Sequence, residues 1–374
     1  MSEQGERLNI GALVGQRVQG LQEYAPEPLE QIAERLGLPL GQLIKLDANE
    51  NPYGPSQAAL DALTAFHDYH RYPDPICRRL RRALGEYVGV EPERILVGNG
   101  SDELIDLILR LFRPGPDGGD IGEVIDCPPT FGMYSFYGVT NDMRVRQFPR
   151  SRDFEVDLES IEALCRADPQ PRILFLASPN NPDGQTLGDQ ALERLLRLPL
   201  LIVLDEAYVE FDEGSRVSWV AEHDNLIVLR TFSKWAGLAG LRVGYGIFPE
   251  ALMSGLWRLK SPYNVNVAAQ IAAEATLAHI DEARERVGRI VAERERLLAR
   301  LRDISYLQVY DSQANYVLCR TQGVAVETIR RALEARGIIL RYFERPGLED
   351  CIRITVGTPM QDEALLLVLR NLDA

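Results

Sequence analysis

A lysine and an arginine lie close together in the stretch TFSKWAGLAGLRVGYG, which covers residues 231–246. Lys234 follows the apolar run LIVL, which predicts a buried strand, so its amine would lie just beyond a strand end. Open α/β sheets bind their ligands at that edge. An amine that is partly desolvated beside a second cation, here Arg242, loses affinity for its proton. The stretch therefore predicts Schiff-base chemistry at Lys234.

The same stretch can hold a phosphate. Thr231 and Ser233 offer hydroxyls on one turn, and Arg242 offers a guanidinium. The glycines between and beyond them let the backbone approach a ligand closely. Taken alone, the stretch is equally compatible with an ordinary strand, loop and strand whose lysine and arginine are solvated. Other segments must decide between these two interpretations.

Composition and charge limit the possible functions. The chain has 374 residues, of which 45% are hydrophobic and 26% charged, as in a soluble globular protein with room for two domains. Its net charge of −14 argues against nucleic acid or an anionic membrane as the main partner. No signal sequence begins the chain, and no apolar run is long enough to span a bilayer. We therefore expect a cytoplasmic protein.

The cysteines and histidines favour neither disulfides nor a metal. The five cysteines are odd in number and scattered, without a CxxC pair, which suits free thiols in a reducing compartment. His67 and His70 could share a helix face, but no third ligand is near them in the sequence. We expect no metal site.

The pattern of apolar runs predicts an α/β fold. RILFLASP, LLIVLDEAY and NLIVLRTFS are nearly continuous apolar strands separated by crossover lengths, which favours a mainly parallel sheet covered by helices on both faces. Beyond Lys260 shorter strands and helices alternate, as in a smaller α+β domain. We predict an N-terminal arm that joins the small domain (1–45), a large domain (46–262) and a small C-terminal domain (263–374) that starts with a long linking helix at about 268–303.

Polar residues follow several of these strands. Asp205 comes directly after four apolar residues, an expensive place for a carboxylate unless a cation meets it. Tyr208 follows it on the same strand end, and Asn181 lies in the turn SPNNPDGQ. Phe131, just after a Pro-Pro pair, could cover the face of a ring. These side chains would meet at one edge of the sheet.

The segment ILVGNGSDELIDLILRLF predicts a strand, a glycine turn and a helix. Ser101 is placed to cap the helix, and Asp102 lies in its first turn. A helix start that opens from such a turn binds phosphate through its amides. Glu103 occupies the third position of a possible GxGxxG, so the dinucleotide fingerprint fails.

One cofactor needs all of these groups. Pyridoxal 5′-phosphate requires an amine, a buried acid that keeps its pyridine nitrogen protonated, an aromatic face and a phosphate cradle. Lys234 would bind it covalently, Asp205 would hold the ring nitrogen, and Phe131 would stack on the ring. Asn181 and Tyr208 would donate to the ring oxygen. The phosphate would be held by the amides of Ser101 and Asp102 together with Thr231, Ser233 and Arg242.

The motifs resemble those of a known family. LDANENPYGP, RYPDP, GNGSDE, PPTFGMY, SPNNPDG, DEAY, TFSKWAGLAGLRVGYG, IILRYF and CIRITVG occur in the order found in the fold-type I, class II aminotransferases, and most closely in the histidinol-phosphate aminotransferases. Two positions depart from the family pattern: Phe131 replaces a tyrosine, and Asp183 replaces a threonine. Neither change removes a group that the chemistry requires.

The resemblance implies a homodimer with active sites at the subunit boundary. By motif, Tyr72 would reach the cofactor phosphate of the partner subunit, and Arg341 and Arg353 would bind the substrate phosphate. Asn181 would also contact the substrate. Tyr24, in the arm, matches a substrate-contacting tyrosine through a looser motif.

The implied reaction transfers the amine of L-histidinol phosphate to 2-oxoglutarate, which gives imidazole acetol phosphate and L-glutamate, a step of histidine biosynthesis. Lys234, Asp205 and Tyr208 would be the catalytic residues. An aromatic amino acid aminotransferase and a decarboxylase of a phosphorylated amino acid share this scaffold, and paired arginines do not separate the three, because carboxylates and phosphates both attract arginine. These alternatives stay open at the level of sequence.

Overall fold

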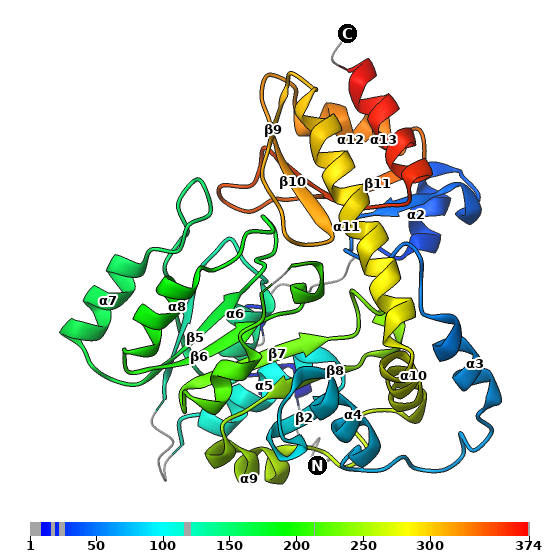
Figure 1. The fold of residues 1–374 in the computed structure, drawn as a ribbon. Coiled ribbons are helices and arrows are strands. Elements are labelled where there is room, and N and C mark those ends of the chain that lie inside the picture. Colours follow the sequence, from blue (N-terminus) through cyan, green and yellow to red (C-terminus); the bar gives the residue numbers. More distant parts are fainter. Residues whose placement is uncertain (1–8, 16–18, 22–26, 116–120, 213, 373–374) are drawn as a thin grey trace, which may run out of the picture.

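A computed structural model describes residues 9–15, 19–21, 27–115, 121–212 and 214–372. Two sheets organise these residues, one of seven strands and one of five (Figure 1). Short 3-10 helices connect the larger elements: η1 Ile10–Leu13, η2 Leu40–Gln42, η3 Pro92–Arg94, η4 Val209–Phe211, η5 Val217–Ala221 and η6 Ala239–Leu241.

The seven-stranded sheet has the order β2-β8-β7-β6-β5-β3-β4. Neighbouring strands from β7 to β4 are parallel, and only β8 runs against its two neighbours. The mainly parallel sheet predicted from the sequence is confirmed. Its strands are β2 Ile95–Gly98, β3 Glu123–Asp126, β4 Arg144–Gln147, β5 Arg172–Ala177, β6 Leu200–Asp205, β7 Leu226–Thr231 and β8 Gly244–Ile247.

Helices cover both faces of this sheet, as its apolar strands require. On β6, Ile202 and Leu204 enter one buried cluster, whereas Leu201 and Val203 enter another on the opposite face. The helices α4, α7, α8 and α10 pack on the first face, and α5, α6 and α9 pack on the second. The bounds are α3 Gln57–Ala65, α4 Arg78–Val88, α5 Gly100–Phe112, α6 Met133–Thr140, α7 Leu158–Ala167, α8 Asp189–Leu196, α9 Glu250–Leu259 and α10 Val267–Ala278.

The five-stranded sheet has the order β1-β11-β12-β10-β9. β1 is parallel to β11 and comes from the N-terminal part of the chain, whereas the other pairs are antiparallel. The strands are β1 Ile44–Leu46, β9 Leu307–Val309, β10 Tyr316–Thr321, β11 Ile338–Tyr342 and β12 Cys351–Thr355. The accompanying helices are α2 Leu29–Leu36, α11 Ile280–Arg302, α12 Val326–Glu334 and α13 Pro359–Asn371.

The long helical region predicted at about 268–303 is two helices. α10 ends and α11 begins at His279, whose φ of −121° and ψ of 45° lie outside the helical range. Asp281 and Glu282 occupy the first turn of α11, where acidic side chains stabilise a helix start. α10 packs on α3 and α4, and α11 runs from there to the smaller sheet (Figure 1).

The prediction that Ser101 caps α5 is wrong: the N-cap residue is Asn99. The helix begins at Gly100 rather than after Ser101, because Gly100 takes a φ of +77° and turns the chain into the helix earlier. The side chain of Asn99 makes no capping hydrogen bond with a described residue; the backbone amide of Asn99 donates to the carboxylate of Glu103 at 2.5 Å. Ser101 therefore lies in the first turn.

Among the described residues, no helix combines the length and the apolar character needed to cross a membrane.

The loop after β7 and the loop before α3 touch through two glycines. Gly237 has a φ of +69°, and a Cβ on it would lie 2.4 Å from the carbonyl carbon of Gly54. This contact presses the segment that carries Lys234 against the segment that precedes α3. Any side chain at Gly237 would separate the two.

We predict that Gly237→Ala destabilises the protein by about 1–3 kcal/mol, since the methyl group meets backbone and the residue is strained at positive φ. Gly240→Ala is the matched control, because nothing lies within 4 Å of a Cβ there. Urea unfolding of both variants measures the difference through the midpoints. Equal midpoints would contradict the role given to this contact.

Candidate active site

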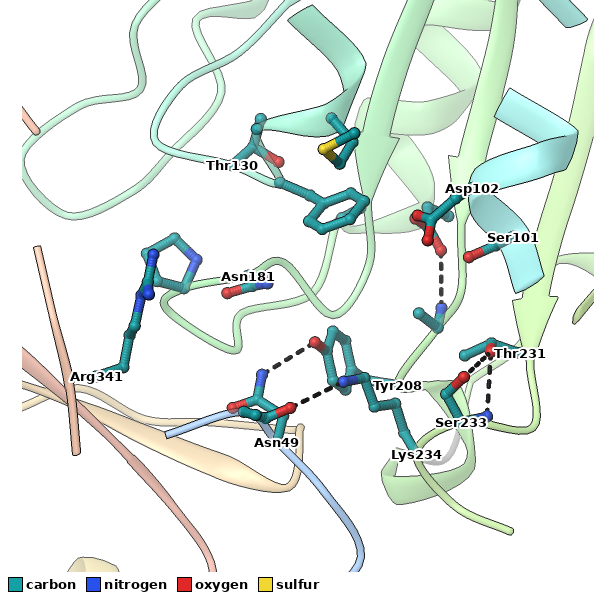
Figure 2. Close-up of a pocket in the computed structure, with 18 of the residues that line it drawn as sticks. Asn49, Ser101, Asp102, Thr130, Asn181, Tyr208, Thr231, Ser233, Lys234 and Arg341 are labelled. Carbon is teal, nitrogen blue, oxygen red and sulfur yellow. Dashed lines mark hydrogen bonds between the residues drawn. The ribbon is translucent and has the colours of Figure 1, made fainter. Parts of the chain in front are cut away.

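A cavity of about 480 Å³ lies where the carboxyl ends of β6 and β7 face the smaller sheet. It brings together twelve of the site residues predicted from the sequence, drawn from both sheets (Figure 2). These residues are Ser101, Asp102, Phe131, Asn181, Asp205, Tyr208, Thr231, Ser233, Lys234, Arg242, Arg341 and Arg353. In Figure 2, Arg341 lies at the opposite end of the cavity from Ser101 and Asp102.

Lys234 projects into this cavity from the loop after β7. Its Nζ donates to the carbonyl of Ala48 at 3.0 Å (Figure 2) and forms no ion pair with a described residue. Burial, together with the nearby guanidinium of Arg353, lowers the pKa of Lys234 to about 8. A large share of the amine is therefore neutral near pH 8, as a nucleophile or a base requires.

Asp205 ends β6 and is only 4% exposed. The sequence predicts a cation beside this carboxylate, but Asp205 forms no ion pair with any described residue. Its carboxylate instead accepts from the Tyr134 hydroxyl at 2.8 Å and from the amide of Ala207 at 3.1 Å. Burial raises the pKa of Asp205 to about 6, against the lowering effect of these two donors. The carboxylate is thus oriented by the protein and left without a cation.

Tyr134 is a site residue that sequence reasoning missed. It is fully buried on α6, stacks on Phe175 with ring centroids 5.0 Å apart, and meets Phe131 edge-on at 5.5 Å. It therefore orients both the carboxylate of Asp205 and the ring of Phe131. The motif PPTFGMY contains it, but only the fold shows that its hydroxyl reaches Asp205.

Asn49 was also missed. Its Nδ2 donates to the Tyr208 hydroxyl at 2.9 Å (Figure 2), while its own amide donates to Oγ1 of Thr355 at 2.9 Å. It links the loop after β1 to the end of β6 and to β12. The density of asparagine, proline and glycine in LDANENPYGPS was the available signal, since such a loop has many polar groups to satisfy.

Hydroxyls and a helix start lie together at the other end of the cavity. Thr231 Oγ1 accepts from the amide of Ser233 at 3.1 Å, and its hydroxyl lies 3.0 Å from that of Ser233. Arg242 donates to Asp102 at 2.8 Å. A Cβ on Gly244 would lie 2.6 Å from the amide nitrogen of Ser101, so only glycine lets α5 begin this close to β8. Such amides and hydroxyls form an anion site.

Arg353 is a buried guanidinium, 7% exposed, without an acidic partner among the described residues. It donates to Oδ1 of Asn181 at 2.5 Å and to the carbonyl of Asp47 at 2.6 Å, and its Nε has no hydrogen-bond partner in the part of the chain that the structure describes. Arg341 is its register partner on β11 and likewise forms no ion pair with a described residue. A buried charge in this state needs an anion from outside the chain.

One predicted site residue, Tyr72, does not line this cavity. Tyr72 is 81% exposed and stacks on Tyr263, with ring centroids 4.5 Å apart. Tyr24 lies outside the described residues. A residue that sequence reasoning did not select, Arg345, does line the cavity.

Comparison with known proteins gives a consistent result. Residues 41–369 match the family model for aminotransferases of class I and II. The histidinol-phosphate aminotransferase of Roseiflexus castenholzii is 52% identical over 97% of this chain and 99% of its own length. The chloroplastic histidinol-phosphate aminotransferase of Nicotiana tabacum is 44% identical over 99% of this chain and 89% of its own length.

Among solved structures, the histidinol-phosphate aminotransferase from Sinorhizobium meliloti in complex with pyridoxal 5′-phosphate superposes with a TM-score of 0.84. It is 26% identical, and the match covers 96% of this chain and 97% of that one. The residues that match the family model include both sheets and every described residue that lines the cavity. The chain belongs to the class I and II aminotransferases.

Proposed function

We propose that this protein transfers the amine of L-histidinol phosphate to 2-oxoglutarate, with pyridoxal 5′-phosphate as its cofactor, and releases imidazole acetol phosphate and L-glutamate. One observation carries the proposal beyond the family: Arg353 and Arg341 line the same cavity as Lys234, and neither forms an ion pair with a described residue. A substrate that brings an amine and a distal anion satisfies both features. The named relatives at 52% and 44% identity support this substrate.

The cavity fits the cofactor. The carboxylate of Asp205, which forms no ion pair with a described residue, suits a protonated ring nitrogen, and Asn181 and Tyr208 would bind the ring oxygen. The half-buried Phe131 offers an aromatic face. The phosphate would be held by Arg242, Thr231, Ser233 and the amides of Ser101 and Asp102. When bound, the cofactor supplies an electron sink for the charge left on the substrate carbon.

Lys234 has two tasks in this reaction. Its neutral amine would hold the cofactor, and the amine of the substrate would take that place during the reaction. The amine of Lys234 would then move a proton at the substrate carbon, first as a base and then as an acid. A pKa near 8 suits both directions, because the group exchanges protons readily close to neutral pH.

The arginines bind the anionic ends of both substrates. A guanidinium fork can take a phosphate in the first half-reaction and a carboxylate in the second. Arg353 has this double task, Arg341 adds a second contact, and Asn181 positions Arg353 through its 2.5 Å hydrogen bond. Tyr24 in the arm stays a predicted substrate contact.

The protein is proposed to act as a homodimer in the cytoplasm. Tyr72 is too exposed to serve its own cavity, and its stack on Tyr263 presents an aromatic surface that suits a second copy of this chain. Tyr72 would then reach the cofactor phosphate of the partner subunit. The five cysteines are all buried free thiols, which suits a reducing compartment.

The test is a single half-reaction followed by the absorbance of the cofactor. The loaded protein is mixed separately with L-histidinol phosphate, phenylalanine and O-phosphothreonine. We expect histidinol phosphate to convert the cofactor to its amine form fastest, and 2-oxoglutarate to restore it. Faster conversion by phenylalanine would instead identify an aromatic aminotransferase. Release of carbon dioxide from phosphothreonine would identify a decarboxylase.

We predict that covalent capture of pyridoxal phosphate by the cofactor-free protein depends on pH with a midpoint of about 8. Only the neutral amine of Lys234 attacks, so the rate rises with pH and levels off above the pKa. Borohydride reduction followed by peptide mass analysis measures the trapped fraction at each pH. A midpoint near the ordinary lysine value of 10.5 would contradict the burial of this amine.

Asp205→Asn tests the buried acid without measuring activity. Because burial raises the pKa of Asp205 from 3.8 to about 6, the ionised form opposes folding, and that opposition appears as pH rises from about 4 to about 6. In the cofactor-free protein the variant should therefore gain stability relative to the wild type across this range, by up to about 3 kcal/mol.

Cofactor binding should reduce that gain, since a protonated ring nitrogen offers Asp205 the missing cation. Urea unfolding at a series of pH values, with and without pyridoxal phosphate, provides the measurement. If variant and wild type differed in stability by the same amount at every pH, the pKa of Asp205 would not be raised in the folded protein.

A further inference from the structure

A third arginine lines the cavity from the loop between β11 and β12. Arg345 is exposed, and its guanidinium lies against Gly132, which directly follows Phe131 and precedes α6. A Cβ on Gly132 would lie 2.7 Å from Nη2 of Arg345 and 3.0 Å from Nη1. The loop from the smaller sheet therefore reaches across the cavity to the segment that carries Phe131.

This arginine does not hold the fold together. Its side chain forms no hydrogen bond and no ion pair with any described residue, and its charge offsets only a small part of the burial that raises the pKa of the Asp126 carboxyl. Other arginines of the smaller sheet do pair: Arg320, for example, bonds to Asp350 and to the hydroxyl of Tyr310. An arginine that lines a cavity, touches the opposite wall and has no described acid within ion-pair distance is available to bind a ligand anion.

Its position also complements the other two arginines. Arg353 is buried and held by Asn181 and Asp47, so its guanidinium is fixed. Arg341 lines the same cavity on the preceding strand. Arg345 is exposed on a loop, so its long side chain can adjust to a ligand that is already held by the fixed pair. Three cations that enter one cavity from the smaller sheet and its β11–β12 loop suit a dianion better than a monoanion.

We propose that Arg345 is a specificity residue that contacts the distal phosphate of the substrate and so favours phosphorylated over unphosphorylated amines. The inference rests on the proposed function. A phosphate carries up to two negative charges and three acceptor oxygens, which is enough for a third guanidinium after Arg341 and Arg353 are satisfied. The ring of phenylalanine has no such group, and the distal carboxylate of 2-oxoglutarate has one charge.

Arg345→Gln tests this role against the matched control Arg336→Gln. Arg336 is an exposed arginine between α12 and β11 that does not line the cavity, so the control removes the same charge from the same part of the chain. Single half-reactions are measured with L-histidinol phosphate, L-histidinol and phenylalanine, and the return half-reaction with 2-oxoglutarate. Inorganic phosphate is added as a competitor to measure anion binding independently of turnover.

We expect Arg345→Gln to lower kcat/KM for histidinol phosphate by roughly 10–100-fold, the scale of one lost hydrogen-bonded charge contact. Histidinol and phenylalanine should change little, 2-oxoglutarate should show a smaller loss, and inorganic phosphate should inhibit less strongly. An equal loss with phenylalanine, or no loss with histidinol phosphate, would overturn the assignment. If the wild type itself does not prefer histidinol phosphate over phenylalanine, the proposed function fails before any variant is compared.

Gly132→Ala provides a second test of the same contact. The backbone of Gly132 has a φ of −64°, which alanine adopts without strain, but the added methyl occupies the place of the guanidinium. This variant should reproduce part of the loss with histidinol phosphate. In the double variant the two effects should not add, because both act through one contact. Additive effects would show that Arg345 does not work from this position.

Discussion

The site depends on positive charge that the chain buries without neutralising it. Lys234 and Arg353 share one cavity, and neither forms an ion pair with any described residue, although the chain as a whole has a net charge of −14. Isolated buried cations are costly, so such an arrangement persists only where an anion or a loss of the proton relieves it. Lys234 can lose its proton, whereas Arg353 cannot, because a guanidinium stays charged in proteins. The first is therefore prepared for chemistry and the second for binding.

The two sheets are needed together because each supplies one half of this charge. β7 of the large sheet leads into the loop of Lys234, and β12 of the smaller sheet carries Arg353. The segment between β1 and α3 joins them: Ala48 accepts from Lys234, and Asp47 accepts from Arg353. This segment touches the Lys234 loop where Gly54 meets Gly237. The contact therefore fixes how far Lys234 lies from Arg353. The cavity is thus a property of the interface between the sheets rather than of either sheet.

What could be predicted from the sequence follows from local rules. Apolar runs indicated the parallel strands, and because parallel strands end at one edge, polar residues after different strands could be placed in one site. Contacts that depend on packing could not be predicted in this way. The Tyr134 hydroxyl reaches Asp205 only because α6 docks on the sheet, and Arg345 reaches Gly132 only because two loops far apart in sequence meet. At His279 the chain ends one helix and starts another, and the acidic first turn of α11 favours this new start. The pattern of apolar residues alone does not show where one helix gives way to the next.

Asp205 shows how the protein uses burial. The sequence required a cation beside this carboxylate, and the chain supplies hydrogen bonds from Tyr134 and Ala207 instead. Burial favours the neutral form of any ionisable group, so it raises the pKa of Asp205 to about 6 and lowers that of Lys234 to about 8. The same desolvation therefore moves an acid and a base toward each other and toward neutral pH. A ligand with a cationic ring nitrogen would supply Asp205 with the opposite charge that no described residue supplies, and its anionic phosphate would meet the hydroxyls, amides and Arg242 at the other end of the cavity. The charges of the cavity and of the proposed cofactor are complementary for this physical reason.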